Sequence, residues 1–183
     1  MMKIGLISDI HGYPHRFKRA IELLKDADVI LCAGDVLYHG PRNPILDGYN
    51  PQGLIEELKK IDKPVIIARG NCDAEVDLMV LEYPVFTPVV LFEKDGVRFM
   101  VNHGHEYSDE QIKLMIDKFN IDVMVLGHTH VRRFERYKNS VIVNPGSISV
   151  PKGDEIPSLA YFEDGYIVFV NIDNGEVIEK NKI

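Results

Sequence analysis

Lys3-Ile4-Gly5-Leu6-Ile7-Ser8-Asp9-Ile10-His11 is the stretch that decides the fold, because a short apolar run ends directly in two side chains able to bind a metal. Apolar runs of this length are typical of strands buried on both faces of a sheet. The pattern recurs as Val29 to Ala33 before Asp35, Val65 to Ala68 before Asn71, Val97 to Val101 before His103, and Val123 to Leu126 before His128 and His130. The sequence therefore predicts core strands that each deliver polar residues at their carboxyl ends.

Helical and hairpin patterns divide the chain into two halves. Apolar residues at helical spacing predict helices over Pro14 to Lys25, over Pro51 to Ile61, and from Ser108, where Gln111 completes a capping box. Later hairpin signals are Asp95-Gly96, Asp164-Gly165 and Asn174-Gly175. Strand and helix alternate first, and mainly antiparallel strands follow. This order predicts one α/β (α+β) domain over residues 1–183, with two stacked sheets covered by helices.

Composition narrows the class of protein. The N-terminal apolar run stops at Ser8, too early for a signal peptide or a membrane span, so we expect a cytoplasmic protein with no membrane partner. Cys32 and Cys72 are the two cysteines, too few for a disulfide framework or a thiolate zinc site. The formal charge of -7 disfavours extended nucleic acid as a partner.

The polar residues are expected to meet in one cleft, because ligands bind beyond the carboxyl ends of strands in α/β sheets. Gly34, Gly70 and Gly127 each precede one of these residues, which suits a backbone that turns sharply out of a strand. His128 and His130 are two residues apart. In an extended chain both side chains would point the same way.

The donor types indicate the metal chemistry. Taken singly, Asp9 is explained as a turn cap, Asn71 as part of a turn and His103 as a core histidine, but the ordered blocks together indicate a metal site. Imidazole, carboxylate and amide donors without thiolate suit manganese, iron, nickel, cobalt or zinc better than calcium. Two ions about 3.5 to 4 Å apart can share a carboxylate and hold a bridging hydroxide that attacks phosphorus. Asp35, in the middle of the set, is the expected bridge.

These blocks resemble those of the calcineurin-like metallophosphoesterases, and most closely the small YfcE-type phosphodiesterases. The closer resemblance rests on Gly34-Asp35-Val36-Leu37 with His39-Gly40-Pro41-Arg42-Asn43, on Arg69-Gly70-Asn71-Cys72-Asp73, and on Asn144-Pro145-Gly146-Ser147. It implies a four-layer αββα sandwich of two mixed sheets and a dinuclear site, commonly manganese-dependent.

The resemblance also implies a role for each ligand. One ion would be held by Asp9, His11 and His130, the other by Asn71, His103 and His128, with Asp35 as the bridge. Asp35, Asn71 and His103 would carry catalysis. Many superfamily members have a histidine after the Gly-Asn pair, where this chain has Cys72. A thiol with an ordinary pKa of about 8.5 is a poor substitute for imidazole, so esters with good leaving groups should be favoured.

Four residues are candidates for substrate binding. Cys72 follows the ligand Asn71, and His105 lies two positions after His103, although a plain surface histidine explains His105 equally well. His39 and Arg42 lie on the irregular segment 37–50, which is expected to overhang Asp35. Arg42 would fork onto a phosphate oxygen. The alternative is a solvated loop held by prolines.

The preferred function is hydrolysis of small phosphodiesters. One alternative is phosphomonoesterase action on a phosphoprotein or nucleotide. Another is a non-catalytic scaffold like the retromer subunit of the same fold, which a complete set of metal ligands disfavours. A repair-type nuclease is disfavoured by the acidic charge and short length. The resemblance also favours a homo-oligomer, either a dimer or a tetramer.

Overall fold

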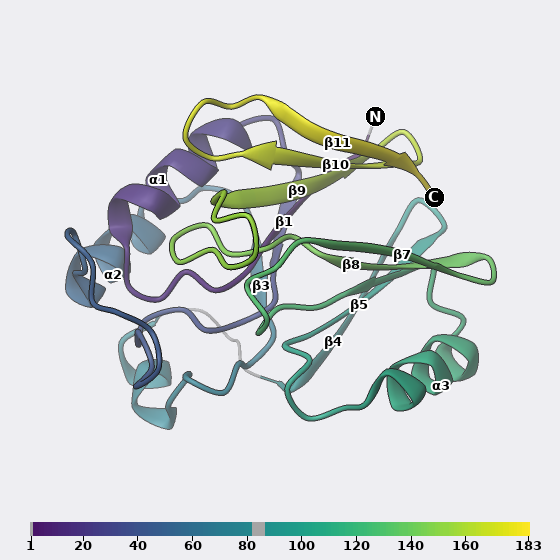
Figure 1. The fold of residues 1–183 in the computed structure, drawn as a ribbon, viewed down its shortest axis with the longest axis horizontal. Helices are drawn as coiled ribbons and strands as arrows, with labels where there is room; N and C mark the ends of the chain where they lie inside the picture. The colour runs from purple at the N-terminus through teal and green to yellow at the C-terminus, as the bar shows by residue number, and fades with distance from the viewer. Residues whose placement is uncertain (1, 82–86) are drawn as a thin grey trace.

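In the computed structural model two β-sheets face each other, and helices cover both outer faces (Figure 1). The structure describes residues 2–81 and 87–183. One sheet has the order β11-β10-β9-β1-β2-β3, made of Val177–Lys182, Tyr166–Asn171, Ser158–Glu163, Lys3–Ile7, Val29–Cys32 and Val65–Ile67. The other has the order β4-β5-β6-β8-β7, made of Val89–Lys94, Val97–Asn102, Val123–Val125, Ser140–Asn144 and Arg133–Tyr137. Both sheets are mixed, as predicted.

Parallel pairing brings strand ends together. In the first sheet β1, β2 and β3 run parallel, whereas β9, β10 and β11 are antiparallel. In the second sheet β5, β6 and β8 are parallel, and β4 and β7 pair antiparallel at its edges. The prediction of a mainly antiparallel second half is therefore wrong for the centre of this sheet. There α3 (Asp109–Phe119) connects β5 to β6, as a parallel crossover requires.

Three apolar layers separate the four layers of structure. In β2, Ile30 and Cys32 face α1 (Pro14–Leu23) and α2 (Pro51–Lys59), whereas Val29 and Leu31 face the other sheet. In β6, Val123 and Val125 face the first sheet, while Met124 packs with α3. The alternation follows from the two-residue repeat of a strand. The predicted αββα sandwich is confirmed.

The helices begin where the sequence predicts. Pro14 and Pro51 are the first residues of α1 and α2, which end slightly before the predicted Lys25 and Ile61. At α3 the backbone N–H of Gln111 donates to the Ser108 hydroxyl at 3.3 Å, and the Gln111 side chain accepts from the Ser108 N–H at 2.8 Å. The predicted capping box is therefore confirmed. Within the described ranges, no helix combines the length and apolar character needed to cross a membrane.

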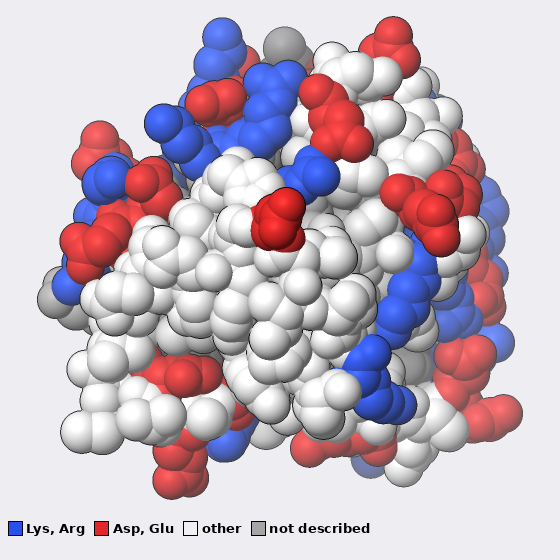
Figure 2. Space-filling view, turned by 60° about the vertical axis from the view of Figure 1, so that its left-hand side comes forward, with Lys and Arg blue, Asp and Glu red and all other residues white. Residues whose placement is uncertain are grey.

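One side of the molecule carries few charges. Figure 2 turns the side of α1, α2 and segment 37–50 toward the viewer, and a broad area without charged side chains crosses its middle. Segment 37–50 has no helix or strand, as predicted, and Ile45 and Leu46 on it are 63% and 46% exposed. The short 3₁₀ helix η1 (Glu75–Met79) also exposes apolar side chains.

The layer between the sheets should account for much of the stability. Leu31 is fully buried there, so we expect Leu31→Ala to lower the free energy of unfolding by about 2–5 kcal/mol, through lost burial and a residual cavity. Urea denaturation measures the change. Leu114→Ala on α3 is the matched control, because Leu114 is 59% exposed and should contribute little. Equal losses in the two variants would contradict this account of the core.

Candidate metal centre

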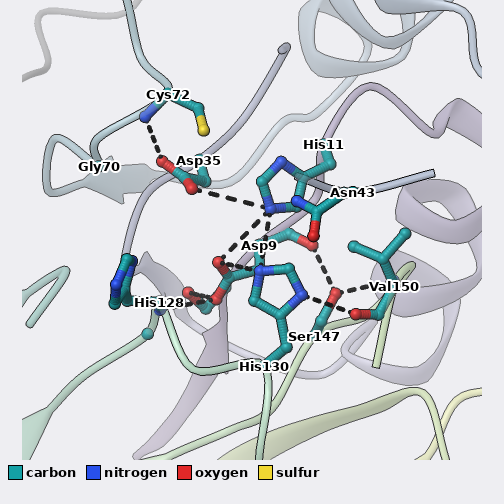
Figure 3. A network of polar contacts seen from close by, with 12 residues as sticks. Asp9, His11, Asp35, Asn43, Gly70, Cys72, His128, His130, Ser147 and Val150 are labelled. Carbon is teal, nitrogen blue, oxygen red and sulfur yellow. Dashed lines mark hydrogen bonds and ion pairs between the residues drawn. The ribbon is translucent and has the colours of Figure 1, made fainter. Parts of the chain in front are cut away.

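Strand ends from both sheets supply the candidate ligands. Asp9 and His11 follow β1, Asp35 follows β2, and Asn71 follows β3. The second sheet contributes His103 directly after β5, with His128 and His130 after β6. The side chains of Asp9, His11, Asp35, His128 and His130 converge on one site in Figure 3. The structure therefore brings together the residues that the sequence pattern singled out.

The backbone is strained where these ligands lie. Five of the seven candidate ligands have a left-handed backbone, with φ of 54° at Asp9, 51° at His11, 58° at Asp35, 69° at His128 and 59° at His130. Non-glycine residues rarely adopt this conformation, and such strain persists where the surroundings enforce it. The prediction that His128 and His130 share an extended chain is wrong. Both side chains still reach the site because the two left-handed residues turn the chain twice.

The first donor cluster consists of Asp9, His11 and His130. The Nε2 atoms of His11 and His130 lie 3.2 Å apart. Oδ1 of Asp9 lies 3.1 Å from Nε2 of His130 and 3.6 Å from Nε2 of His11. All three residues are buried, and Asp9 Oδ1 has no hydrogen-bond partner among the described residues. A buried oxygen without a partner is costly unless a cation lies against it.

Backbone carbonyls fix the histidine tautomers in this site. Nδ1 of His11 lies 2.7 Å from the carbonyl oxygen of Tyr38, and Nδ1 of His130 lies 2.6 Å from that of Val150. Nδ1 of His103 lies 2.6 Å from the carbonyl oxygen of Ala33. A carbonyl accepts only, so each Nδ1 carries a proton, and each ring in its neutral form presents a lone pair at Nε2. Opposed lone pairs on His11 and His130 suit a shared cation.

The second donor cluster consists of Asn71, His103 and His128. Oδ1 of Asn71 lies 2.7 Å from Nδ1 of His128 and 3.1 Å from Nε2 of His103. Oδ2 of Asp35 lies 3.2 Å from His103 Nε2 and 3.7 Å from His11 Nε2. Asp35 thus stands between the two clusters. Among the described residues, ligand atoms of Asp9, His11 and His130, and likewise of Asp9, Asp35 and His103, lie close enough together to hold a metal ion.

The titrating groups of the site are strongly coupled. Burial alone would raise the pKa of Asp9, but its contacts with His11 and His130 outweigh burial and hold that pKa well below the usual range. Burial likewise disfavours protonated His103, yet its hydrogen bond to Asp35 and the charges of Asp9 and Asp35 raise the pKa of His103 to about 9. The carboxylates are therefore ionised and ready to bind a cation.

Asp73 supports the site and was not predicted to do so. One of its carboxylate oxygens accepts the N–H groups of Asp35 at 2.9 Å and Gly70 at 2.8 Å. The other accepts the N–H of Val36 at 2.7 Å. Asp73 thereby ties the loop after β2 to the loop after β3. Its place in the turn Gly70-Asn71-Cys72-Asp73 was the available signal, since aspartate often accepts backbone N–H groups within turns.

The segment after β8 supports the other half of the site. The Ser147 hydroxyl donates to the carbonyl of Asp9 at 2.7 Å and accepts the N–H of Val150 at 2.9 Å. Asn144 donates to the carbonyl of Gly127 at 2.7 Å. These residues belong to the Asn144-Pro145-Gly146-Ser147 block, which the sequence analysis used only for the resemblance. Their contacts show that the block holds the ligand loops in place.

The three glycines next to the ligands have two different functions. Gly34 has φ of 97°, which suits the predicted sharp turn out of β2. A Cβ on Gly70 would lie 2.1 Å from Oδ1 of Asp35, and one on Gly127 would lie 2.1 Å from the Ser8 hydroxyl. These two positions require glycine because neighbouring groups approach closely, rather than because of a left-handed backbone.

The substrate-binding candidates are only partly brought together. One pocket is lined by Asp35, Asn71, His128 and His130 and also by Arg42 and Cys72. Asn43 and Lys152, which the sequence analysis did not single out, line it as well. A larger groove lies between α1 and α2, but none of the candidate ligands lines it.

The two remaining candidates lie outside the lining of this pocket. Nδ1 of His39 lies 3.4 Å from the Tyr49 hydroxyl, and its ring packs edge-on against Tyr38 and Tyr49. His105 lines a neighbouring pocket that also includes Asn71, and its ring centre is 5.3 Å from that of His103. His39 is therefore held by aromatic neighbours, whereas His105 borders the second cluster.

Comparison with known proteins identifies the family. Residues 2–164 match the calcineurin-like phosphoesterase superfamily domain. The chain belongs to this superfamily. It is 37% identical over 182 residues to Phosphodiesterase YfcE of Escherichia coli K12, covering 97% of this chain and 96% of that protein. It is 28% identical to Phosphodiesterase MJ0936 of Methanocaldococcus jannaschii, covering 79% of this chain and 83% of that protein.

Solved structures agree with this family assignment. The structure of YfcE, described as a phosphoesterase from E. coli, superposes with a TM-score of 0.87 at 32% identity and covers 100% of both chains. Vacuolar Protein Sorting 29 from Cryptosporidium parvum superposes with a TM-score of 0.69 at 21% identity, covering 100% of this chain and 98% of that chain. The similarity to Vacuolar Protein Sorting 29, at this low identity, shows a shared fold alone. The family match and the names of these relatives show that this protein is a phosphoesterase enzyme.

Metal binding should displace a proton from His103. In the metal-free protein the raised pKa of about 9 keeps this imidazole protonated at neutral pH, whereas a metal ligand must be neutral. We therefore expect Mn²⁺ affinity to rise between about pH 6 and pH 8, by up to about tenfold per pH unit for one displaced proton. Calorimetry in buffers of different ionisation enthalpy counts the released protons. A pH-independent affinity without proton release would contradict this expectation.

Proposed function

We propose that this phosphoesterase hydrolyses small phosphodiesters at a dinuclear metal site. The observation that carries the proposal is the position of Asp35, whose Oδ2 lies 3.2 Å from the His103 ring and 3.7 Å from the His11 ring. One carboxylate between two separate donor clusters is what two neighbouring ions require. The partnerless Oδ1 of Asp9 supports occupancy of the first cluster.

The proposed roles follow from the two clusters. Asp9, His11 and His130 hold one ion, Asn71, His103 and His128 hold the other, and Asp35 touches both. When bound, two divalent ions supply a hydroxide nucleophile at neutral pH and stabilise the charge that develops on the phosphoryl oxygens. Hydrogen bonds from Nδ1 of His11, His103 and His130 to the carbonyls of Tyr38, Ala33 and Val150 orient each ring so that its Nε2 would face the metal. Asp35, Asn71 and His103 are the residues that we assign to catalysis.

Cys72 supports a preference for esters with good leaving groups. Burial, together with the charge of Asp35, raises the pKa of the Cys72 thiol to about 12. Such a thiol stays neutral and is a weak proton donor at pH 7, so the leaving oxygen departs without strong acid help. The diester preference itself is supported by the names of the E. coli and M. jannaschii relatives.

The same proposal includes manganese as the ion, with nickel, cobalt, iron and zinc as alternatives that the donors also suit. We further propose a cytoplasmic homo-oligomer, either a dimer or a tetramer. Free thiols at Cys32 and Cys72 suit a reducing compartment. The exposed apolar side chains of Ile45, Val76 and Met79, at 63%, 61% and 83%, support association between copies.

Metal add-back tests the function. Chelator-stripped protein is given manganese, nickel, cobalt, zinc or magnesium singly, and cleavage of bis-p-nitrophenyl phosphate is compared with that of p-nitrophenyl phosphate. We expect manganese to restore diester cleavage, and Asp35→Asn, which keeps the size of the side chain, to lower the rate more than about 100-fold. Faster monoester cleavage would favour a phosphomonoesterase. If no metal restored turnover of either ester, the enzymatic proposal would fail for this site.

Changing Cys72 to histidine should widen the range of leaving groups. We expect Cys72→His to accelerate cleavage of alkyl diesters, which need a proton on the departing oxygen, more than cleavage of p-nitrophenyl diesters. The comparison is a plot of log kcat/KM against leaving-group pKa, which should become less steep. Cys72→Ser is the control, because its hydroxyl is no better as an acid. An unchanged slope in Cys72→His would argue against the assigned role of position 72.

A further inference from the structure

We propose that Arg42 and Lys152 form a second anion subsite, so that the preferred substrate is a small phosphodiester carrying an additional negative group on one arm. This inference rests on the proposed function and specifies its substrate class. Both side chains line the same pocket as Asp35, Asn71, His128 and His130. The pocket therefore presents two exposed cations next to the metal ligands.

The two cations are not engaged elsewhere. Among the described residues, neither side chain makes an ion pair or hydrogen bond. Asp154, the acid closest to Lys152 in sequence, is already paired with Arg132. Many other cationic side chains of this acidic chain have a carboxylate partner, for example Lys138 with Asp117 at 2.7 Å and Lys113 with Glu135 at 3.4 Å. Among the described residues these two cations have no carboxylate partner, so both are free to receive an anion from outside the chain.

The loops that carry the two side chains are fixed. The N–H of Lys152 donates to the carbonyl of His130 at 3.0 Å, which ties Lys152 to a proposed metal ligand. Near Arg42, the Asn43 side chain donates to the carbonyl of His39 at 2.8 Å. A Cβ on Gly40 would lie 2.9 Å from Sγ of Cys72, so this loop packs closely on the site. Preorganised backbone at both positions favours a binding role.

A count of charges shows what the two cations would recognise. Asp9 and Asp35 are the charged groups in the proposed ligand set, because its four histidines and Asn71 are neutral. Two divalent ions would bring four positive charges. The two aspartates, one hydroxide and one singly charged diester carry four negative charges, so the metal site with a simple diester is already neutral. Asp73 lies behind Asp35, where its oxygens accept three backbone N–H groups. Arg42 and Lys152 thus add positive charge that a simple diester leaves unmatched, and a carboxylate or phosphate on one arm would neutralise it.

Three diesters that share a p-nitrophenolate leaving group test the subsite. Their second arms are propyl, 2-carboxyethyl and choline, which are neutral, anionic and cationic. On the metal-loaded protein we expect KM to be lowest for the carboxyethyl ester and highest for the choline ester, with similar kcat because the leaving group is shared. The preference should weaken as salt is added. For exposed ion pairs we expect each cation to change KM by at most about fivefold.

Matched variants assign the preference to the two side chains. Arg42→Gln and Lys152→Gln should each narrow the difference in KM between the carboxyethyl and propyl esters. Lys118→Gln removes the same charge from an exposed position on the last turn of α3, which does not line this pocket. This variant should leave the difference in KM intact. A preference that persists in both pocket variants would overturn the assignment.

A binding measurement separates this inference from the proposed function. Calorimetry compares 3-phosphonopropionate with propylphosphonate, which lacks the carboxylate, and needs no turnover. Tighter binding of the first, lost in Arg42→Gln and Lys152→Gln, supports the subsite even if no diester is cleaved. If diesters are cleaved with equal KM for all three arms and the two phosphonates bind equally, the subsite is rejected while the phosphodiesterase stands.

Discussion

The fully buried carboxylate of Asp9 lies against Nε2 of His11 and His130, and most of the surrounding structure serves to hold this crowded polar arrangement. Among the described residues Asp9 Oδ1 has no hydrogen-bond partner, and the Nε2 atoms of His11 and His130 lie 3.2 Å apart. A polar cluster of this kind costs free energy in the interior. It persists because two well-packed sheets over-determine the positions of the loops that carry it.

The restraint comes from backbone contacts that cross between loops. Asp73 fixes the loops after β2 and β3 against each other, and Ser147 fixes the loop after β1 against the segment after β8. The close approach at Gly70 and Gly127 leaves no room for a side chain. Together these contacts allow left-handed backbone at five ligands, a conformation that isolated chains would rarely adopt. Strain and rigidity are therefore two aspects of the same site.

The sequence predicted the layers because their physics is local. Apolar runs, capping residues and hairpin turns each leave a mark within a few residues, so the strands and the helix starts followed from them, whereas the four-layer αββα class was implied by the family resemblance. The parallel pairing of β5, β6 and β8 did not, since it depends on partners distant in sequence. The backbone of His128 and His130 was also missed, because its hydrogen bonds, from the His128 N–H to Asp9 at 3.1 Å and from the Lys152 N–H to the His130 carbonyl at 3.0 Å, join residues far apart in the chain.

The difference between local sequence patterns and contacts that are distant in sequence also decides what could be predicted about the pocket. Candidate metal ligands could be recognised by type and order, since few other functions need four histidines, two aspartates and an asparagine at strand ends. Residues next to them could not, because a lysine or arginine has the same appearance on a solvated surface and in a cleft. His39 has a plausible type and is held by Tyr49, whereas Lys152 has an unremarkable context and lines the pocket. Specificity is therefore carried by side chains whose neighbours only the fold reveals, and the charge balance of the pocket, rather than any motif, identifies them.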